Sequence, residues 1–423
     1  MTIYALLALA IGTPLDAQRA PLGVERDSAR AAADSMGARL RRAEQAIAIL
    51  QQQLAEQAAQ AVTTKSRMHL ELTGRVLVHA SANDHRVNNA DNPQFARPDS
   101  AGLTATPFVM SARQSTIGAK LSATDILGAH FTGDVDVDFY GGQQASSGGR
   151  TFPLIRMRTA RATVRWPDAE VMVGQESPLV SGLDPVSPSS IGTPDFAAAG
   201  NLWLWLPQVR VTVETPGAVR FGVQGAVLSN ITGDAVGLFD TDVDAAERSG
   251  RPALEGRARV RWGEDERASE IGCGGHLGWL DVPSAARVQT HAAMCDARLS
   301  LTSQIDVRGE AYDGQGLRGL GGGGIGQNLD RFSLPLHDRG GWAQLNIDAT
   351  SLVKLGGGCG VDMPAEGDVA ASGRFRNQSC AGYSIIRPSG PLFIGGEVRR
   401  IDTKYTTGSV SNFHFSLAMG FEF

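Results

Sequence analysis

The sequence lacks any long hydrophobic run, because no internal stretch approaches the roughly 20 apolar residues of a membrane-spanning helix. This absence excludes a helical membrane protein but leaves a β-barrel open, since barrel strands are apolar on one face only. The net charge of -5 is mild and argues against bulk nucleic-acid binding. The sequence also lacks a P-loop, a nucleophile elbow and an H-E-x-x-H motif, so we expect no enzyme activity, cofactor or metal.

Cysteine is scarce as well, with four residues in 423. Cys273 and Cys295 flank one short segment, and Cys359 and Cys380 flank another. Each pair suits a disulfide across its own hairpin. A zinc site is the alternative, but the spacings have no C-x-x-C character, so we predict two local disulfides.

The last twelve residues alternate strictly between apolar and polar or small side chains. The apolar set is Phe413, Phe415, Leu417, Met419, Phe421 and Phe423. A period of two places this set on one face of a strand. A strand that is apolar on one side and ends the chain on phenylalanine suits the lipid-facing wall of a membrane barrel.

The same alternation recurs from Met68 onward, most clearly in residues 69–80, 129–140 and 254–262. A soluble sandwich would bury the apolar face in a core, whereas a membrane barrel turns it toward lipid. Sixteen segments qualify as strands, an even number as a single-chain bacterial barrel requires. They lie near 68–80, 109–122, 128–140, 153–166, 169–176, 201–214, 219–231, 253–263, 269–281, 288–301, 305–318, 340–349, 352–361, 379–388, 392–405 and 412–423.

The connections between these segments alternate between short and long, which distinguishes the barrel from a sandwich. Short turns lie near 124–125, 167–168, 216–217, 263–268, 302–303, 350–351 and 389–390. Longer loops lie near 81–108, 141–152, 177–200, 232–252, 319–339 and 362–378. Short turns on one rim and long loops on the other are typical of outer-membrane barrels.

Two segments precede the predicted barrel. Residues 1–17 contain an apolar run and a small residue, Ala17, at a suitable cleavage position, which indicates a secretory signal peptide. They lack a basic start, so a misplaced start codon or a buried helix is the alternative.

Residues 24–62 keep apolar residues at alternating spacings of three and four, including Leu40, Ile47 and Leu54. This pattern predicts a periplasmic coiled coil, and the alternative is a lone helix packed on the barrel.

The predicted lumen carries opposed charges. Asp134, Asp136 and Asp138 share one face of a strand, and Arg257, Arg259 and Arg261 share one face of another. In the segment 153–166, Arg156 and Arg158 have one parity and Arg161 and Arg165 the other, so only one pair faces inward throughout unless a bulge intervenes. We expect Arg156 and Arg158 inside. A basic lumen favours anions, although each arginine can equally serve to pair with a carboxylate and hold the wall.

Two loops are singled out by composition. The Pro- and Ser-rich loop 177–200 is either an ordinary external loop or a constriction folded into the lumen, with Asp184 and Asp195 as its charged members. The run GLGGGGIG at 319–326 resembles a phosphate loop, but it lacks the following Lys-Ser/Thr, so we predict a flexible loop instead.

Four stretches, SARQSTIGAKL, GDVDVDFYGG, IRMRTARATVRW and EVMVGQESP, resemble the DcaP-like trimeric porins of Gram-negative outer membranes. The resemblance covers roughly residues 68–180, with the coiled-coil preface and the terminal Phe423. It implies a sixteen-stranded barrel, a trimer, and passive uptake of small anionic solutes such as dicarboxylates. It also implies that Arg113, Arg156 and Arg158 line the lumen. The segment after Gly174-Gln175 departs from that pattern, since Glu176-Ser177-Pro178 stands where the family has an aromatic residue.

The sequence therefore predicts an all-β protein: an antiparallel transmembrane barrel of about 16 strands (68–423), preceded by a signal peptide (1–17) and a helical coiled coil (24–62). The predicted function is that of an outer-membrane porin of a Gram-negative-type bacterium, trimeric through its coiled coil and barrel walls and surrounded by lipid. Two alternatives are a barrel enzyme such as a lipid hydrolase and a structural or adhesive trimer.

Overall fold

The computed structural model describes residues 45, 69–100, 102, 105–126, 128–141, 153–232, 243–263, 267–282 and 285–423. The chain divides into two compact units, Met1–Val62 and Thr63–Phe423, and the second holds the whole sheet. The predicted signal peptide and, apart from Gln45, the predicted coiled coil lie outside the described residues. No helix in the described part of the chain is long and apolar enough to cross a membrane.

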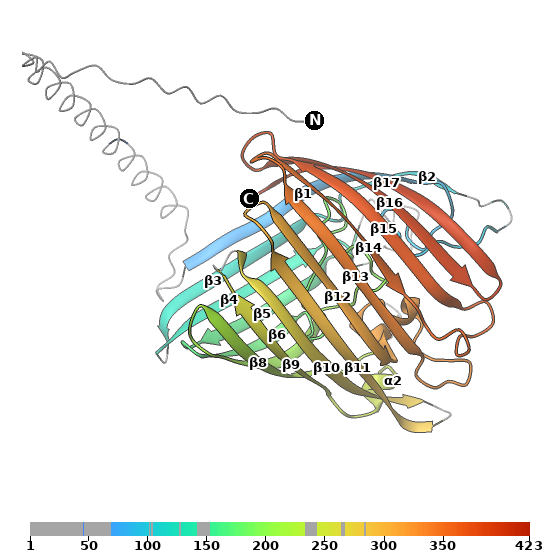
Figure 1. Cartoon of the computed structure of the whole chain (residues 1–423), viewed down its shortest axis with the longest axis horizontal. Helices are drawn as coiled ribbons and strands as arrows, with labels where there is room; N and C mark the ends of the chain where they lie inside the picture. The colour runs from blue at the N-terminus through green and yellow to red at the C-terminus, as the bar shows by residue number, and fades with distance from the viewer. Residues whose placement is uncertain are drawn as a thin grey trace, which may run out of the picture. The chain divides into compact units, whose positions relative to one another are not determined.

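Thr63–Phe423 forms a closed antiparallel β-barrel (Figure 1). The first half of the wall contains β1 (His69–Asn83), β2 (Thr106–Ser111), β3 (Thr116–Ile126), β4 (Ala129–Asp138), β5 (Arg156–Arg165), β6 (Ala169–Glu176), β7 (Leu206–Glu214), β8 (Val219–Leu228) and β9 (Ala253–Trp262). The second half contains β10 (Ser269–Val282), β11 (Ala285–Ser300), β12 (Ile305–Gln315), β13 (His337–Asp348), β14 (Val353–Asp362), β15 (Arg374–Ile386), β16 (Leu392–Tyr405) and β17 (Gly408–Glu422).

The wall has sixteen positions, because β2 and β3 share one. Both pair with β1, and residues 112–115 interrupt them. Each other strand pairs with its sequence neighbour, and β17 closes the barrel against β1, where Val76 lies opposite Phe421. All sixteen predicted segments are present, and each strand overlaps its predicted range. The short turns lie on one rim. The opposite rim carries the long loops, together with the two short connections at 283–284 and 406–407.

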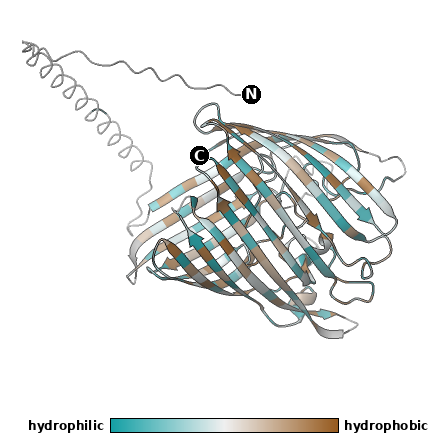
Figure 2. Cartoon of the chain, in the orientation of Figure 1, coloured by the Kyte–Doolittle hydropathy of each residue, from teal (hydrophilic) through white to brown (hydrophobic). Residues whose placement is uncertain are grey.

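The faces of the wall follow the alternation of the sequence (Figure 2). In β17, Phe415 and Leu417 are 51% and 54% exposed, whereas His414 and Ala418 between them are 1% and 0% exposed. Valine and leucine side chains of the other strands are likewise exposed on the outside. The prediction that apolar side chains face outward is confirmed, as a lipid-facing wall requires.

The interior is less uniform than predicted, because part of it is a dry core. Leu179 and Leu202, from the loop 177–205, pack with Leu228 and Met294 of the wall and with Leu317 of a 3₁₀ turn, η2 (Leu317–Leu320). Asn92 and Gln94, from the connection between β1 and β2, also lie inside the barrel. Burying apolar side chains away from water stabilises these inward loops. The lumen is therefore divided between packed loops and water-filled cavities.

Candidate functional site

The loop between β6 and β7, residues 177–205, crosses the lumen. Val186 donates its N–H to Oε1 of Gln344 on β13 at 2.7 Å, and its carbonyl accepts from Nε2 of Gln344 at 2.8 Å. Ser187 Oγ donates to Glu397 on β16 at 2.5 Å. Both wall residues are buried and face inward. The loop therefore folds into the lumen and is not an ordinary external loop.

Asp195 anchors this inner loop. It is fully buried and forms an ion pair with Arg399 of β16, which also binds Glu397 at 2.6 Å and the hydroxyl of Ser190 at 2.6 Å. Burial raises the pKa of the Asp195 carboxyl, and the neighbouring Arg399 opposes that rise. Asp195 therefore holds the loop in place and is not exposed to solutes.

Asp184 lies at the part of the inner loop that faces water. Its side chain is exposed, and its carbonyl accepts from Nη1 of Arg308 on β12 at 3.3 Å. The protein mass around it raises the pKa of the Asp184 carboxyl to about 6, although Arg158 limits the rise. This carboxylate therefore changes charge close to neutral pH.

The acidic strand β4 and the basic strand β5 pair residue by residue inside the barrel. Asp138 binds Arg156 at 2.7 Å, and Asp136 binds Arg158 at 3.0 Å. Asp134 binds Arg161 at 2.6 Å. These six residues form ion pairs between neighbouring strands. Pairing with a carboxylate to stabilise the wall is one of the two roles that the sequence allows for each arginine.

Arg156 and Arg158 face inward as expected, and the bulge that would let the other arginine set face inward too is present. The register shifts between Asp136 and Val137, which lie opposite Thr159 and Met157, so Arg158 is an extra residue in β5. This bulge reverses the alternation and turns Arg161 inward together with Arg156 and Arg158. A bulge of this kind has no periodic signal in the sequence.

The basic strand β9 faces the lumen as predicted. Arg257 is almost buried and binds Asp296 and Glu270 at 2.6 Å each, with Gln224 at 3.0 Å. Arg259 is paired with Glu214 at 2.6 Å, and Arg261 lies one step closer to the short-turn rim. Arg257 therefore holds neighbouring strands together.

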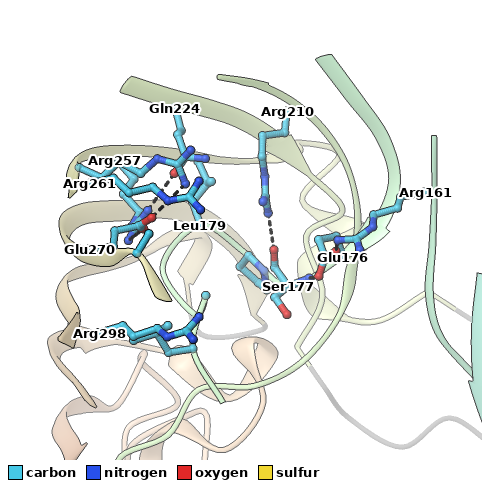
Figure 3. Close-up of a pocket in the computed structure, with 15 residues that line it drawn as sticks. Arg161, Glu176, Ser177, Leu179, Arg210, Gln224, Arg257, Arg261, Glu270 and Arg298 are labelled. Atoms are coloured by element: carbon cyan, nitrogen blue, oxygen red, sulfur yellow. Dashed lines mark hydrogen bonds and ion pairs between the residues drawn. The ribbon is translucent and has the colours of Figure 1, made fainter. Parts of the chain in front are cut away.

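A chamber of about 320 Å³ lies between the inner loop and these strands (Figure 3). It is lined by six arginines and by two glutamates, Glu176 and Glu270, and three of the arginines also pair with Asp134, Glu214 or Asp296. The six are Arg161, Arg210, Arg257, Arg259, Arg261 and Arg298. Arg210 donates to the neutral acceptors Gln208 Oε1 and the Ser177 carbonyl, and so keeps a surplus positive charge next to the inner loop.

A second cavity of about 400 Å³ lies toward the short-turn rim and shares Arg259 and Arg261 with the chamber. Arg165 and Arg220 also line it, together with Asp168, Glu170 and Glu214.

Arg113 lies inside the barrel but away from water. It is 4% exposed, binds Asp91 at 2.7 Å through Nε, and lies 3.8 Å from the centre of the Tyr140 ring. These contacts fix the loop 84–105 to the gap between β2 and β3. The structure thus places Arg113 in a packing role, apart from the chamber arginines.

Arg298 joins the chamber although the sequence analysis did not select it. It follows Asp296 at a spacing of two on β11, with Ala297 and Leu299 on the other face. The alternation of polar and apolar residues in this strand therefore predicts that Arg298 faces the lumen. Arg210 has the same signal on β7, between Val209 and Val211, which are exposed on the outer wall.

The glycine-rich run packs against the wall inside the barrel. Gly324 and Ile325, in the 3₁₀ turn η3 (Gly323–Gly326), donate their N–H groups to Asp338 at 2.7 Å and Asp362 at 2.9 Å. The Leu320 carbonyl accepts the N–H of Leu204 at 3.1 Å, which ties the run to the inner loop. Because carboxylates take these N–H groups, the run does not form a phosphate cradle.

The four cysteines form two disulfides on the outer face of the wall. Cys273 is joined to Cys295 across β10 and β11, and Cys359 to Cys380 across β14 and β15. Within the described ranges, no three His, Cys, Asp or Glu residues come together as a metal site.

No protein-family model matches this sequence, and no curated protein matches it. Solved structures do match. The outer membrane channel DcaP of Acinetobacter baumannii is similar with a TM-score of 0.66 at 16% identity, over 85% of this chain and 99% of that chain.

Two further structures match over 84% of this chain. An anion-selective porin from Comamonas acidovorans has a TM-score of 0.52 at 9% identity, over 100% of that chain. OmpT of Vibrio cholerae in its trimer form has a TM-score of 0.51 at 10% identity, over 99% of that chain. The resemblance seen in the sequence is thus confirmed at the level of the fold, which this chain shares with outer-membrane channels.

Proposed function

We propose that this protein is an outer-membrane porin through which small solutes, preferentially anions, diffuse passively. The observation that carries the proposal is the chamber inside the barrel, which is lined by six arginines, among them Arg210 with its neutral acceptors. The shared fold with outer-membrane channels supports it.

The preference for anions follows from the surplus of charge. Arginines that are matched by carboxylates produce short-range fields that largely cancel, whereas an arginine with neutral acceptors, such as Arg210, attracts anions into the space that it lines. The inner loop narrows the lumen beside this space, so solutes pass close to the arginines. Low-dielectric walls strengthen this attraction.

The barrel lies in the outer membrane of a Gram-negative-type bacterium with its short turns toward the periplasm, as is usual for such barrels. Residues 1–17 direct export, residues 24–62 form the periplasmic coiled coil, and residues 68–423 form the channel. Three copies associate through the coiled coil and the barrel walls. The trimer form of OmpT, which shares the fold, supports this assembly. Diffusion requires no bond-making step, so the proposal assigns the protein no enzymatic activity.

Planar bilayers and vesicles test the proposal together. Purified protein should give stepwise conductance in bilayers, with steps grouped in threes for a trimer. In vesicles, an organic anion should enter faster than a neutral solute and a cation of the same size. Absence of conductance would overturn the porin, and equal entry of anion and cation would overturn the selectivity.

A further inference from the structure

The outer face of β15 and β16 carries a group of basic side chains near the long-loop rim. Arg376 and Lys404 lie directly opposite each other in the register, and Arg400 lies on the same face of β16. They alternate with the buried residues Asn377 and Thr403, which point inward. Arg376, Arg400 and Lys404 are called the basic cluster below.

The basic cluster keeps a positive surplus. Asp402 pairs with Arg400 at 2.9 Å, and Arg376 donates to the neutral Gln378 at 3.1 Å. Like charges directly opposite each other on neighbouring strands are destabilising. An anion placed between Arg376 and Lys404 removes that repulsion and forms charge-assisted hydrogen bonds.

The basic cluster lies at the edge of the apolar band of the wall. Arg400 is opposite Phe413 in the register, and its guanidinium lies 5.4 Å from the centre of that ring. Phe413 begins the outward apolar series of β17 that ends at Phe423. Ten steps of about 3.4 Å, tilted by about 40°, give roughly 26 Å, close to the usual height of about 25 Å for such a band. The cluster is therefore at head-group level.

An apolar groove of about 840 Å³ lies on the outer wall at acyl-chain level next to the cluster. Gly382 and Gly396 form its floor, and its sides include Phe108, Leu355, Val398 and Leu417. Val398 is two residues before Arg400 on the same face of β16, so the groove continues directly into the basic cluster.

We propose that this surface binds a phosphorylated glycolipid of the outer leaflet, with a phosphate on the basic cluster and an acyl chain in the groove. The proposal rests on the outer-membrane location given above but not on the pore. A phosphate group fits between Arg376 and Lys404, and an acyl chain fits the groove above Gly382 and Gly396. A protein partner would instead need acidic side chains at head-group level to match the basic cluster. The charge at head-group depth therefore favours lipid over a second copy of this chain.

Charge reversal tests the phosphate contact. In detergent micelles, native mass spectrometry should detect lipid A, the phosphorylated glycolipid, on the full-length protein. The double variant Arg376→Glu, Lys404→Glu should weaken this binding by about tenfold or more, because charge-assisted hydrogen bonds are lost. Dephosphorylated lipid A should bind the unaltered protein equally weakly. The matched control Arg248→Glu, Arg251→Glu changes two exposed charges elsewhere on the same rim and should leave binding unchanged.

Filling the groove tests the acyl contact. A Cβ at Gly396 meets no atom nearer than 3.9 Å, so Gly396→Leu places a side chain in the groove without a clash in the wall. It should weaken lipid A binding severalfold and leave bilayer conductance unchanged.

Undiminished binding in both variants would overturn the proposal, as would equal affinity for phosphatidylglycerol. Dissociation of an oligomer by Gly396→Leu with unchanged lipid affinity would assign the groove to a second copy instead. Loss of the proposed pore activity alone would not affect these results.

Discussion

Arg399 and the chamber arginines lie within one barrel and act differently. Arg399 is 2% exposed and holds Asp195, Glu397 and the loop carbonyl of Pro93 in a fully buried network. The chamber contains six arginines against two glutamates, and Arg161 in its wall is 42% exposed. The first arrangement is buried and paired with carboxylates, and the second lines an open cavity in which Arg210 has neutral acceptors.

This difference shows that a basic residue inside a barrel is not by itself a sign of anion passage. Arg113 and Arg399 hold inward loops, since each is buried and matched by carboxylates. Access to a cavity separates the chamber arginines from these two residues.

Removing Arg399 should be the most damaging change. Arg399→Met leaves Asp195 and Glu397 buried without their cation, and loss of one partner from a buried ion pair costs about 3–5 kcal/mol. Urea unfolding in detergent micelles, followed by tryptophan fluorescence, measures the free energy of unfolding. Arg210→Met is the matched control and should lower it by about 1 kcal/mol or less, because Arg210 has neutral acceptors beside water. An equal loss of unfolding free energy in both variants would contradict the distinction between Arg399 and the chamber arginines.

Conservative substitution should separate geometry from charge. Arg399→Lys keeps the charge but cannot reach all of Pro93, Ser190, Asp195 and Glu397, so the free energy of unfolding should fall by about 1–3 kcal/mol. Arg261→Lys in the chamber should preserve both stability and anion preference, because the chamber needs only charge. A loss of preference in Arg261→Lys would show that the chamber, too, depends on arginine geometry.

Acidification should produce the smallest change. Partial desolvation by the surrounding wall and loop raises the pKa of Asp184 to about 6, so this carboxylate is charged at pH 8 and neutral at pH 5. The repulsion between the Asp184 carboxylate and a passing anion about 8 Å away in water is about 0.5 kcal/mol. Protonation of Asp184 removes this repulsion, so the preference for anions should rise roughly twofold as pH falls through 6. Asp184→Asn should show the low-pH preference at both pH values. A wild-type preference that is constant from pH 8 to 5 would contradict this assignment.

The wall was predictable because its periodicity extends over every strand. The alternation in residues 412–423 and the short and long connections led to sixteen strands and their faces. The two parities of the arginines in β5 allowed for a bulge, but its position at Arg158 was not predictable, since a single extra residue leaves no repeating signal. Its consequence, an inward Arg161, could be seen only in the folded wall.

The lumen was predictable in its residue types but not in its pairing. The alternation of β4 and β9 indicated inward Asp136 and Arg257, whereas the match of Arg257 with Asp296 depends on the register of β9, β10 and β11. The course of the inner loop depends on single contacts such as Val186 with Gln344, which are 158 residues apart. Such contacts have no local sequence signal.

The reversal potential across a salt gradient shows whether the chamber selects anions. With wild-type protein in a planar bilayer, its sign should show preference for the anion. Arg210→Glu together with Arg261→Glu reverses two of the six positive charges of the chamber and should move the potential strongly toward the cation-selective sign, while Arg248→Glu with Arg251→Glu should leave it unchanged. A wild-type potential of the cation-selective sign, or one that the chamber variant does not move, would contradict the account.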